Sequence, residues 1–239
     1  EATFLLPPTD PAADYRVRIF CPGRELPFAG HPTLGSCAAW LATGATPQRD
    51  DRIVQECGSG LIPIRRDGDR LAFAAPPLIR SGQVEADVLA ERLDHLGLEP
   101  DRVVDAAWID NGPGWLGILL ESADAVLRVE IPGARLPGFD VGLVGLHPAG
   151  AECAIEVRAF FADASGAIRE DPVTGSLNAS VAQWLTESGR VSAPYVAAQG
   201  QCLGRRGRVH VEESGDELWI GGRSPIVVTG TIEISGADG

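Results

Sequence analysis

Two short segments of the chain place a proton-carrying side chain beside glycine at the start of a predicted helix. AGHPT at residues 29–33 contains His31, whose imidazole gains or loses a proton near neutral pH. EDPVTGS at residues 170–176 contains Asp171, a carboxylic acid that can accept a proton or hold a substrate ammonium group. Together the segments offer acid and base chemistry on a small polar molecule.

A run of small and apolar residues follows each segment and predicts a buried helix, over residues 34–43 and 177–188. The first turn of a helix has unpaired backbone N–H groups and the positive end of the helix dipole, and both attract anions. Gly30 and Gly175 let the backbone approach a ligand closely. Two such helix starts that face each other would hold a carboxylate from both sides.

The same residues also have an ordinary structural explanation. Asp171 before a proline, and Thr174 or Ser176 near a helix start, are common capping residues. A lone His31 is equally consistent with a hydrogen-bonded structural histidine. The equivalent places of the two segments in an internal repeat favour one shared site.

The repeat has a spacing of about 145 residues, as expected for two duplicated domains rather than a solenoid. Residues 29–45 and 172–189 each contain a glycine-rich loop, small residues, Trp-Leu and a closing glycine. Gln55 and Gln199 then begin a glycine-rich turn in each copy, and two strand-like runs follow. The repeat predicts two lobes, each a sheet curled around one central helix, with the site in the cleft between them.

The lobes are expected to cover residues 1–103 and 104–224, with residues 225–239 as a C-terminal strand that returns to the first lobe. Residues 85–98 predict an amphipathic helix. Further segments with strand-like patterns are residues 14–20, 106–112, 115–121, 154–160 and 225–234.

The composition is that of a globular protein and limits the kinds of partner. Of 239 residues, 44% are hydrophobic and 22% are charged, with a formal net charge of −13. This negative charge argues against binding to nucleic acid or to an anionic membrane. Because the sequence has no apolar run of about 18 residues and no signal-peptide pattern, we expect a cytoplasmic protein. Five scattered cysteines without a C-x-x-C motif, and histidines without metal-ligand spacing, indicate reduced thiols and no metal site.

Several segments together resemble the PhzF family, the phenazine-biosynthesis-like isomerases, and ELPFAGHPT and EDPVTGS are the most specific of their motifs. The resemblance covers most of the chain. It implies an α+β fold similar to diaminopimelate epimerase, with two β-barrel lobes each wrapped around a central helix, and a homodimer. It also implies a further strand and a G-N-P motif before Glu1, so we expect residues to be missing there. The matching segments are EATFL at 1–5, RVRIFCPGRELPFAGHPTLGSCAAWL at 16–41, EDPVTGSLNASVAQWL at 170–185 and QGQCLGRRGRV at 199–209.

The resemblance also implies roles for single residues. The catalytic acid/base of the family, the glutamate of an E-x-T-F motif, corresponds to Glu1. The residues around the substrate correspond to His31, Asp171 and Ser176, and the donors of backbone N–H groups to its carboxylate correspond to Gly30 and Gly175.

The phenazine enzyme of the family isomerises trans-2,3-dihydro-3-hydroxyanthranilate without a cofactor. A desolvated Glu1 with a raised pKa would take a weakly acidic C–H proton and return it elsewhere on the same face. Asp171 would hold the substrate amine, and His31 would exchange a proton with a substrate oxygen or nitrogen. The expected function is therefore a cofactor-independent isomerase of a small amino- or hydroxy-carboxylate.

Two other functions fit the same cleft: a carboxylate-binding protein with little catalysis, and a related epimerase or lyase. A racemase with two catalytic thiols is disfavoured, because His31 and Asp171 stand at the two helix starts where such enzymes of this fold carry cysteines.

Overall fold

The computed structural model describes residues 1–21, 24–130, 133 and 135–232. Its helices are α1 (Gly30–Ala42), α2 (Ala86–Leu96), α3 (Ala123–Leu127) and α4 (Gly175–Glu187), with short 3₁₀ turns at Pro100–Arg102 and Gln201–Leu203. Its strands are β1 (Ala2–Leu6), β2 (Tyr15–Cys21), β3 (Arg24–Leu26), β4 (Ile53–Cys57), β5 (Gly60–Asp67), β6 (Arg70–Ala74), β7 (Arg80–Gln83), β8 (Val103–Asp110), β9 (Leu116–Leu120), β10 (Asp140–Leu146), β11 (Ile155–Ala162), β12 (Ile168–Asp171), β13 (Tyr195–Gln199), β14 (Gly207–Ser214) and β15 (Glu217–Arg223).

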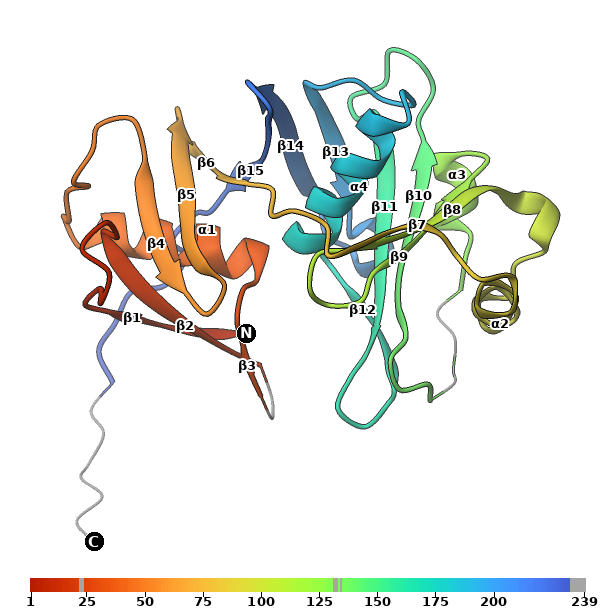
Figure 1. Ribbon diagram of the computed structural model, residues 1–239, viewed down its shortest axis with the longest axis horizontal. Helices are drawn as coiled ribbons and strands as arrows, with labels where there is room; N and C mark the ends of the chain where they lie inside the picture. Colours follow the sequence, from red (N-terminus) through yellow and green to blue (C-terminus); the bar gives the residue numbers. More distant parts are fainter. Residues whose placement is uncertain (22–23, 131–132, 134, 233–239) are drawn as a thin grey trace, which may run out of the picture.

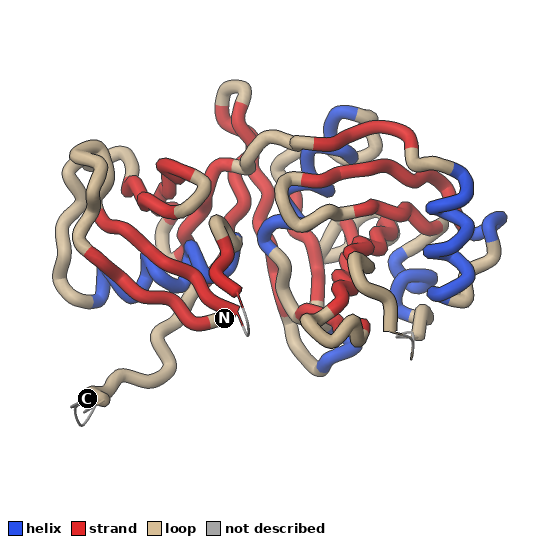
Figure 2. Tube along the Cα trace, turned by 60° about the horizontal axis from the view of Figure 1, so that its bottom comes forward, coloured by secondary structure: helices blue, strands red, loops and turns tan. Residues whose placement is uncertain are grey.

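The described strands form one continuous mixed sheet that bends around two helices (Figure 1). Their order is β1-β2-β4-β5-β6-β15-β14-β13-β11-β10-β9-β8-β7, with β3 beside β2 and β12 beside β11. The antiparallel pair of β6 and β15 joins the half around α1 to the half around α4. Figure 2 shows the same two halves from a second direction. This is the α+β architecture, two lobes each around one helix, that the repeat predicts.

The core confirms that α4 is a buried helix, as its small and apolar residues predict. Leu177, Val181 and Leu185 on α4 are fully buried in a core that also reaches α1. The backbone of β10 comes so close to α4 that a Cβ on Gly142 would lie 2.4 Å from Cδ1 of Leu177. A larger residue there would force the buried side chain of Leu177 to shift.

Burial of α1 is less complete than its composition predicts. Most of its first half is buried, but Trp40 and Leu41 near its C-terminal end are only partly covered, and Ala42 is exposed. Strands β1, β2 and β6 have the most extensive contacts with α1, and Gln55 of β4 reaches it through a hydrogen bond to Thr33. Trp40 is held by stacking on Tyr15, with ring centroids 5.2 Å apart.

A second apolar core lies where α2 and α3 pack with β9 and β10. Leu93 and Leu96 of α2 and Val126 of α3 are buried in it. The amphipathic helix predicted for residues 85–98 is thereby confirmed, and it ends at Gly97, whose left-handed conformation has a φ of 62°. None of the helices in the described part of the chain is long and apolar enough to cross a membrane.

Two predicted boundaries are wrong in ways that affect the site. Helix α1 begins at Gly30 and α4 at Gly175, earlier than predicted, so that His31 lies within the first turn of α1. Proline at position 32 is compatible with this earlier start, because the first turn of a helix does not need its backbone N–H.

The predicted division of the lobes at residues 103 and 104 is also wrong, since it falls within β8. Strand β7 pairs with β8, and α2 packs into the second core, so both belong with the second half. The chain crosses between the halves earlier, in the connector between β6 and β7.

The C-terminal strand predicted for residues 225–234 does not form over residues 225–232, and residues 233–239 lie outside the described part. The preceding strand β15 already has β14 on one side and β6 on the other. The segment after it leaves the sheet with Val227 and Val228 exposed.

Candidate active site

The starts of α1 and α4 meet at the junction of the two halves (Figure 1). A Cβ built on Gly175 would lie 2.6 Å from the Cα of Gly30 and 3.1 Å from the backbone nitrogen of His31. The repeat therefore does bring AGHPT and EDPVTGS together. The missing side chains make room for the opposite helix, whereas the sequence suggested that they make room for a ligand.

Glu1 and His31 form an ion pair beside this junction, with Nε2 of His31 3.0 Å from Oε2 of Glu1. The hydrogen bond to His31 lowers the pKa of Glu1 and outweighs burial, which raises it. Burial alone would lower the pKa of His31, but the hydrogen bond to Glu1 and the charges of Glu1 and Asp171 raise it overall. The expected raised pKa of Glu1 is therefore wrong, because the neighbouring imidazole favours the carboxylate. The side chains are 45% exposed for His31 and 27% exposed for Glu1, so a solute can reach both.

Asp171 ends β12 and lies close enough to the pair for its charge to act on His31. Burial raises the pKa of Asp171, while the hydrogen bond from Thr174 and the charge of His31 partly offset that rise. The hydroxyl of Thr174 donates to Oδ2 of Asp171 at 2.5 Å.

Side-chain capping does not account for either helix start. Thr174 occupies the N-cap position of α4 and Ala29 that of α1, and neither side chain caps its helix. The hydroxyl of Thr174 instead donates to Asp171. Ser176 lies inside the first turn of α4, beyond the capping position.

Ser176 is buried and tied to the turn between β8 and β9. The indole N–H of Trp115 donates to Oγ of Ser176 at 3.1 Å, and the amide of Asn111 donates to the backbone oxygen of Ser176 at 2.9 Å. Among the described hydrogen bonds, the hydroxyl of Ser176 accepts from Trp115 and donates to no residue. Trp115 and Asn111 were missed from the sequence, because a turn 61 to 65 residues upstream has no local signal that links it to α4.

Two buried glutamines hold the segments at the helix starts. Gln199 donates from Nε2 to the backbone oxygen of Asp171 at 2.9 Å and to Oγ1 of Thr174 at 3.0 Å. In the other half, Gln55 donates to Oγ1 of Thr33 at 2.9 Å. The repeat showed both glutamines at equivalent positions, but their role could not be inferred without the hydrogen bonds.

A cavity of about 640 Å³ borders the same junction. His31 and Gly175 line it together with the apolar side chains of Phe73 and Ile220, while Arg70 is among its charged lining residues. Of the six predicted site residues, only His31 and Gly175 border this space. Its size is within the range of small-molecule sites.

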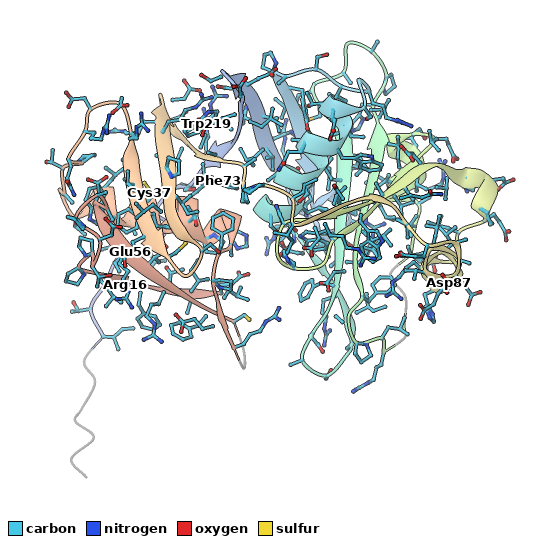
Figure 3. All side chains as sticks on the ribbon, viewed as in Figure 1. Arg16, Cys37, Glu56, Phe73, Asp87 and Trp219 are labelled. Carbon is cyan, nitrogen blue, oxygen red and sulfur yellow. The ribbon has the colours of Figure 1, made fainter. Side chains whose placement is uncertain are left out.

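In the part of the chain that the structure describes, neither helix start has a cysteine or a group of metal-binding side chains. Cys37 is fully buried inside the first half (Figure 3). All five cysteines are free thiols. Among the described residues, no three side chains of His, Cys, Asp or Glu are grouped so that they could hold a metal ion.

Comparison with known proteins identifies relatives that match most of this chain. Residues 1–230 match the family described as phenazine biosynthesis-like protein, PhzC-PhzF. Antisense-enhancing sequence 1 of Schizosaccharomyces pombe is 30% identical, over 96% of this chain and 83% of the relative. Trans-2,3-dihydro-3-hydroxyanthranilate isomerase of Pseudomonas aeruginosa is 31% identical, over 90% of this chain and 76% of the relative.

Solved structures show the same fold. A PhzF family protein of Bacillus anthracis superposes with a TM-score of 0.73 at 20% identity, over 92% of this chain and 80% of the other. A probable proline racemase of Agrobacterium radiobacter superposes with a TM-score of 0.51 at 17% identity, over 92% and 71%. The two-lobed fold of the epimerases, expected from the sequence, is therefore confirmed. The chain belongs to the PhzF family of phenazine biosynthesis-like proteins, and it is an isomerase.

Proposed function

We propose that this isomerase moves a proton and a double bond within a small amino- or hydroxy-carboxylate, by acid and base catalysis at the starts of α1 and α4. The Glu1–His31 pair is the observation that supports this proposal most directly. It places a carboxylate that can accept a proton beside an imidazole that can donate one, and both side chains are accessible. The relative named trans-2,3-dihydro-3-hydroxyanthranilate isomerase supports a substrate of this class.

The two helix starts supply the binding site for the substrate carboxylate. Backbone N–H groups in the first turns of α1 and α4, among them those of Gly30 and Gly175, have no acceptor within their helices. Both helix dipoles also have their positive ends there. These two effects favour an anion in the space that both helix starts face, beside the contact of Gly30 with Gly175, even though the whole chain carries a net charge of −13.

Proton transfer in this proposal begins and ends at Glu1. Its carboxylate removes a proton from a substrate carbon, and the electron pair of that C–H bond forms the new double bond. The negative charge that develops is stabilised by the protonated His31, whose pKa is raised in this site. Glu1 then delivers a proton, which exchanges with solvent while Glu1 holds it, to a second carbon on the same face, and the electron pair of the original double bond forms the new C–H bond. The product has the same atoms as the substrate, and no electrons are gained or lost.

Asp171 orients the substrate amine. Its Oδ2 is in a hydrogen bond with Thr174, and its Oδ1 has no hydrogen bond to any residue in the described part of the chain. Oδ1 is thus the atom that would accept from an ammonium group, and Ser176 would donate its hydroxyl proton to a second polar group of the substrate.

The test is incorporation of solvent deuterium into trans-2,3-dihydro-3-hydroxyanthranilate, followed by mass spectrometry and product analysis. We expect isomerised, labelled product from the wild type and a loss of at least about 100-fold in Glu1→Gln. Glu25→Gln is the matched control, because Glu25 is an exposed glutamate of the same half that pairs with Arg18. Normal turnover by Glu1→Gln would overturn the proposed role of Glu1.

The same experiment separates the alternatives. Binding of 3-hydroxyanthranilate, an aromatic analogue of the substrate, would support the carboxylate-binding protein if trans-2,3-dihydro-3-hydroxyanthranilate itself gains no label. Inversion of a stereocentre would support an epimerase, and elimination of water would support a lyase. The homodimer implied by the family is a further proposal, which light scattering tests against the chain mass of 25.1 kDa.

A further inference from the structure

We propose that Gln199 is a positioning residue that acts through Thr174 to orient the Asp171 carboxylate and to favour its ionised form. The role of Asp171 in catalysis rests on the proposed function. The hydrogen bonds between Gln199, Thr174 and Asp171 are independent of that function.

The hydrogen bonds of Gln199 fix which end of its amide faces Asp171. Oε1 of Gln199 accepts from the backbone N–H of Thr174 at 3.1 Å and from the side-chain amide of Asn178 at 2.8 Å. Nε2 of Gln199 donates to the backbone oxygen of Asp171 and to Oγ1 of Thr174. A flipped amide would set its oxygen against the backbone oxygen of Asp171 and its NH₂ against the backbone N–H of Thr174, so only one orientation satisfies both backbone groups.

This orientation also fixes the hydroxyl proton of Thr174. Because Oγ1 of Thr174 accepts from Gln199, its single proton is directed to Oδ2 of Asp171, 2.5 Å away. A donor to a carboxylate stabilises the ionised form and lowers its pKa. Gln199 therefore donates to Thr174, and Thr174 donates to Asp171. The orientation of the buried amide of Gln199 thus determines whether the carboxylate of Asp171 receives this hydrogen bond.

Two other side-chain charges act on Asp171, and neither belongs to this chain of donors. They are the imidazole of His31 and the carboxylate of Glu1. The neighbouring Glu170 does not contribute to this face, because its side chain is fully buried in an ion pair with Arg158. Removal of the Thr174 donor would leave these surroundings unchanged, so a shift in the pKa of Asp171 would report the donor alone.

The other half of the molecule supplies a matched control. Gln55 is as buried as Gln199, at 0% and 1% exposed, and it donates to Thr33 at the start of α1. It also accepts from the hydroxyl of Tyr15 at 3.0 Å. In the described hydrogen bonds, Thr33 donates to no carboxylate. Gln55→Glu therefore shows the effect of a buried negative charge alone, without a hydrogen-bonded connection to an acid.

The variants are Thr174→Val, Thr174→Ser, Gln199→Glu and Gln55→Glu. Valine has the shape of threonine without the hydroxyl, and serine retains the hydroxyl. Glutamate at position 199 replaces the donor Nε2 by an acceptor oxygen, which would draw the Thr174 proton away from Asp171. The pKa of Asp171 is measured by ¹³C NMR titration of its side-chain carboxyl, assigned by comparison with Asp171→Asn.

We expect Thr174→Val and Gln199→Glu each to raise the pKa of Asp171 by about one unit. Thr174→Ser should keep the wild-type pKa of Asp171. Gln55→Glu should lower the stability of the protein without changing that pKa.

An unchanged pKa of Asp171 in Thr174→Val would overturn the inference, as would an equal shift in Gln55→Glu. If Gln199→Glu does not fold, Thr174→Val and Thr174→Ser still decide the question, since both are neutral. The titration needs no turnover. A protein that shows the shift but exchanges no deuterium would contradict the proposed function and leave the inference about Gln199 intact.

Discussion

Gly30 and Gly175 touch through their backbones: a Cβ built on Gly30 would lie 2.5 Å from the Cα of Gly175, and the reverse distance is 2.6 Å. Each is the first residue of its helix, so the contact fixes how the two positive helix ends face the same space. Backbone atoms cannot rotate away as a flexible side chain can. The geometry of the site therefore depends on the absence of a side chain at both positions.

Gly30→Ala and Gly175→Ala should each separate the helix starts and lower the free energy of unfolding by about 1–3 kcal/mol, measured by urea denaturation. Deuterium incorporation should fall further than stability alone explains, because the two halves of the site move apart. Gly35→Ala is the control within α1, since nothing lies within 4 Å of its added Cβ. There alanine should stabilise the helix. Equal behaviour of Gly35→Ala and Gly30→Ala would contradict the packing argument.

The repeat was the most informative feature of the sequence. It placed AGHPT and EDPVTGS at equivalent positions and predicted that the two helix starts lie together, but it gave their glycines to a ligand, whereas the structure uses them for the contact between the helices. Gln55 and Gln199 were also visible as equivalent residues. Their hydrogen bonds to Thr33 and Thr174 were not, because a pattern of residue types does not fix side-chain direction.

Other features depend on contacts between distant parts of the chain. The pKa of Glu1 was predicted with the wrong sign, because burial was considered without the His31 hydrogen bond that outweighs it. Residues 225–232 have strand-like composition but form no strand, and Val227 and Val228 are exposed there. Trp115 reaches Ser176 through a turn that only the folded sheet brings near α4.

Removal of the imidazole in His31→Gln should change the pH profile of deuterium incorporation. The hydrogen bond from His31 lowers the pKa of Glu1, so its loss should move the acidic limb of kcat/KM to higher pH. The pKa of His31 is raised, so the basic limb that reports its deprotonation should disappear. His95→Gln, on α2, is the control and should keep both limbs. An unchanged acidic limb in His31→Gln would show that another group sets it.

The same pair makes a stability contribution with a defined pH window. For Glu1 the lowered pKa gives stability that is present above about pH 4.5 and is lost as the pH falls. For His31 the raised pKa gives stability that is present below about pH 6.5 and is lost as the pH rises. The difference in unfolding free energy between wild type and His31→Gln should therefore be largest between these values.

Arg158 and Glu170 anchor β12, which ends at Asp171, to β11. Arg158 donates from Nε and Nη2 to the two carboxylate oxygens of Glu170 at 2.9 and 2.8 Å, and the side chains are 3% and 0% exposed. Arg158→Met leaves a buried carboxylate without its partner and should destabilise the protein by about 3–5 kcal/mol. The double variant with Glu170→Gln should recover much of that loss in urea denaturation. No recovery would show that the backbone contacts of Arg158 to Val126 and Val129 matter more than the charge.

Asp140, at the start of β10, should make stability fall as the pH rises. Burial raises the pKa of Asp140 to about 6, and nearby Asp110 adds to the shift, while Arg24 and Arg92 oppose it. A carboxyl whose folded pKa is raised binds its proton more tightly in the native state, so its contribution is complete below pH 4 and is lost as the pH passes 6. Asp140→Asn removes this titration. As the pH rises from 4 to 7, the free energy of unfolding of Asp140→Asn, measured in urea, should therefore increase by about 2 kcal/mol relative to the wild type.

Asp94→Asn, at an exposed position on α2, is the control and should show a much smaller change over the same pH range. If the difference between Asp140→Asn and the wild type does not change with pH, Asp140 is ionised without cost in the folded protein.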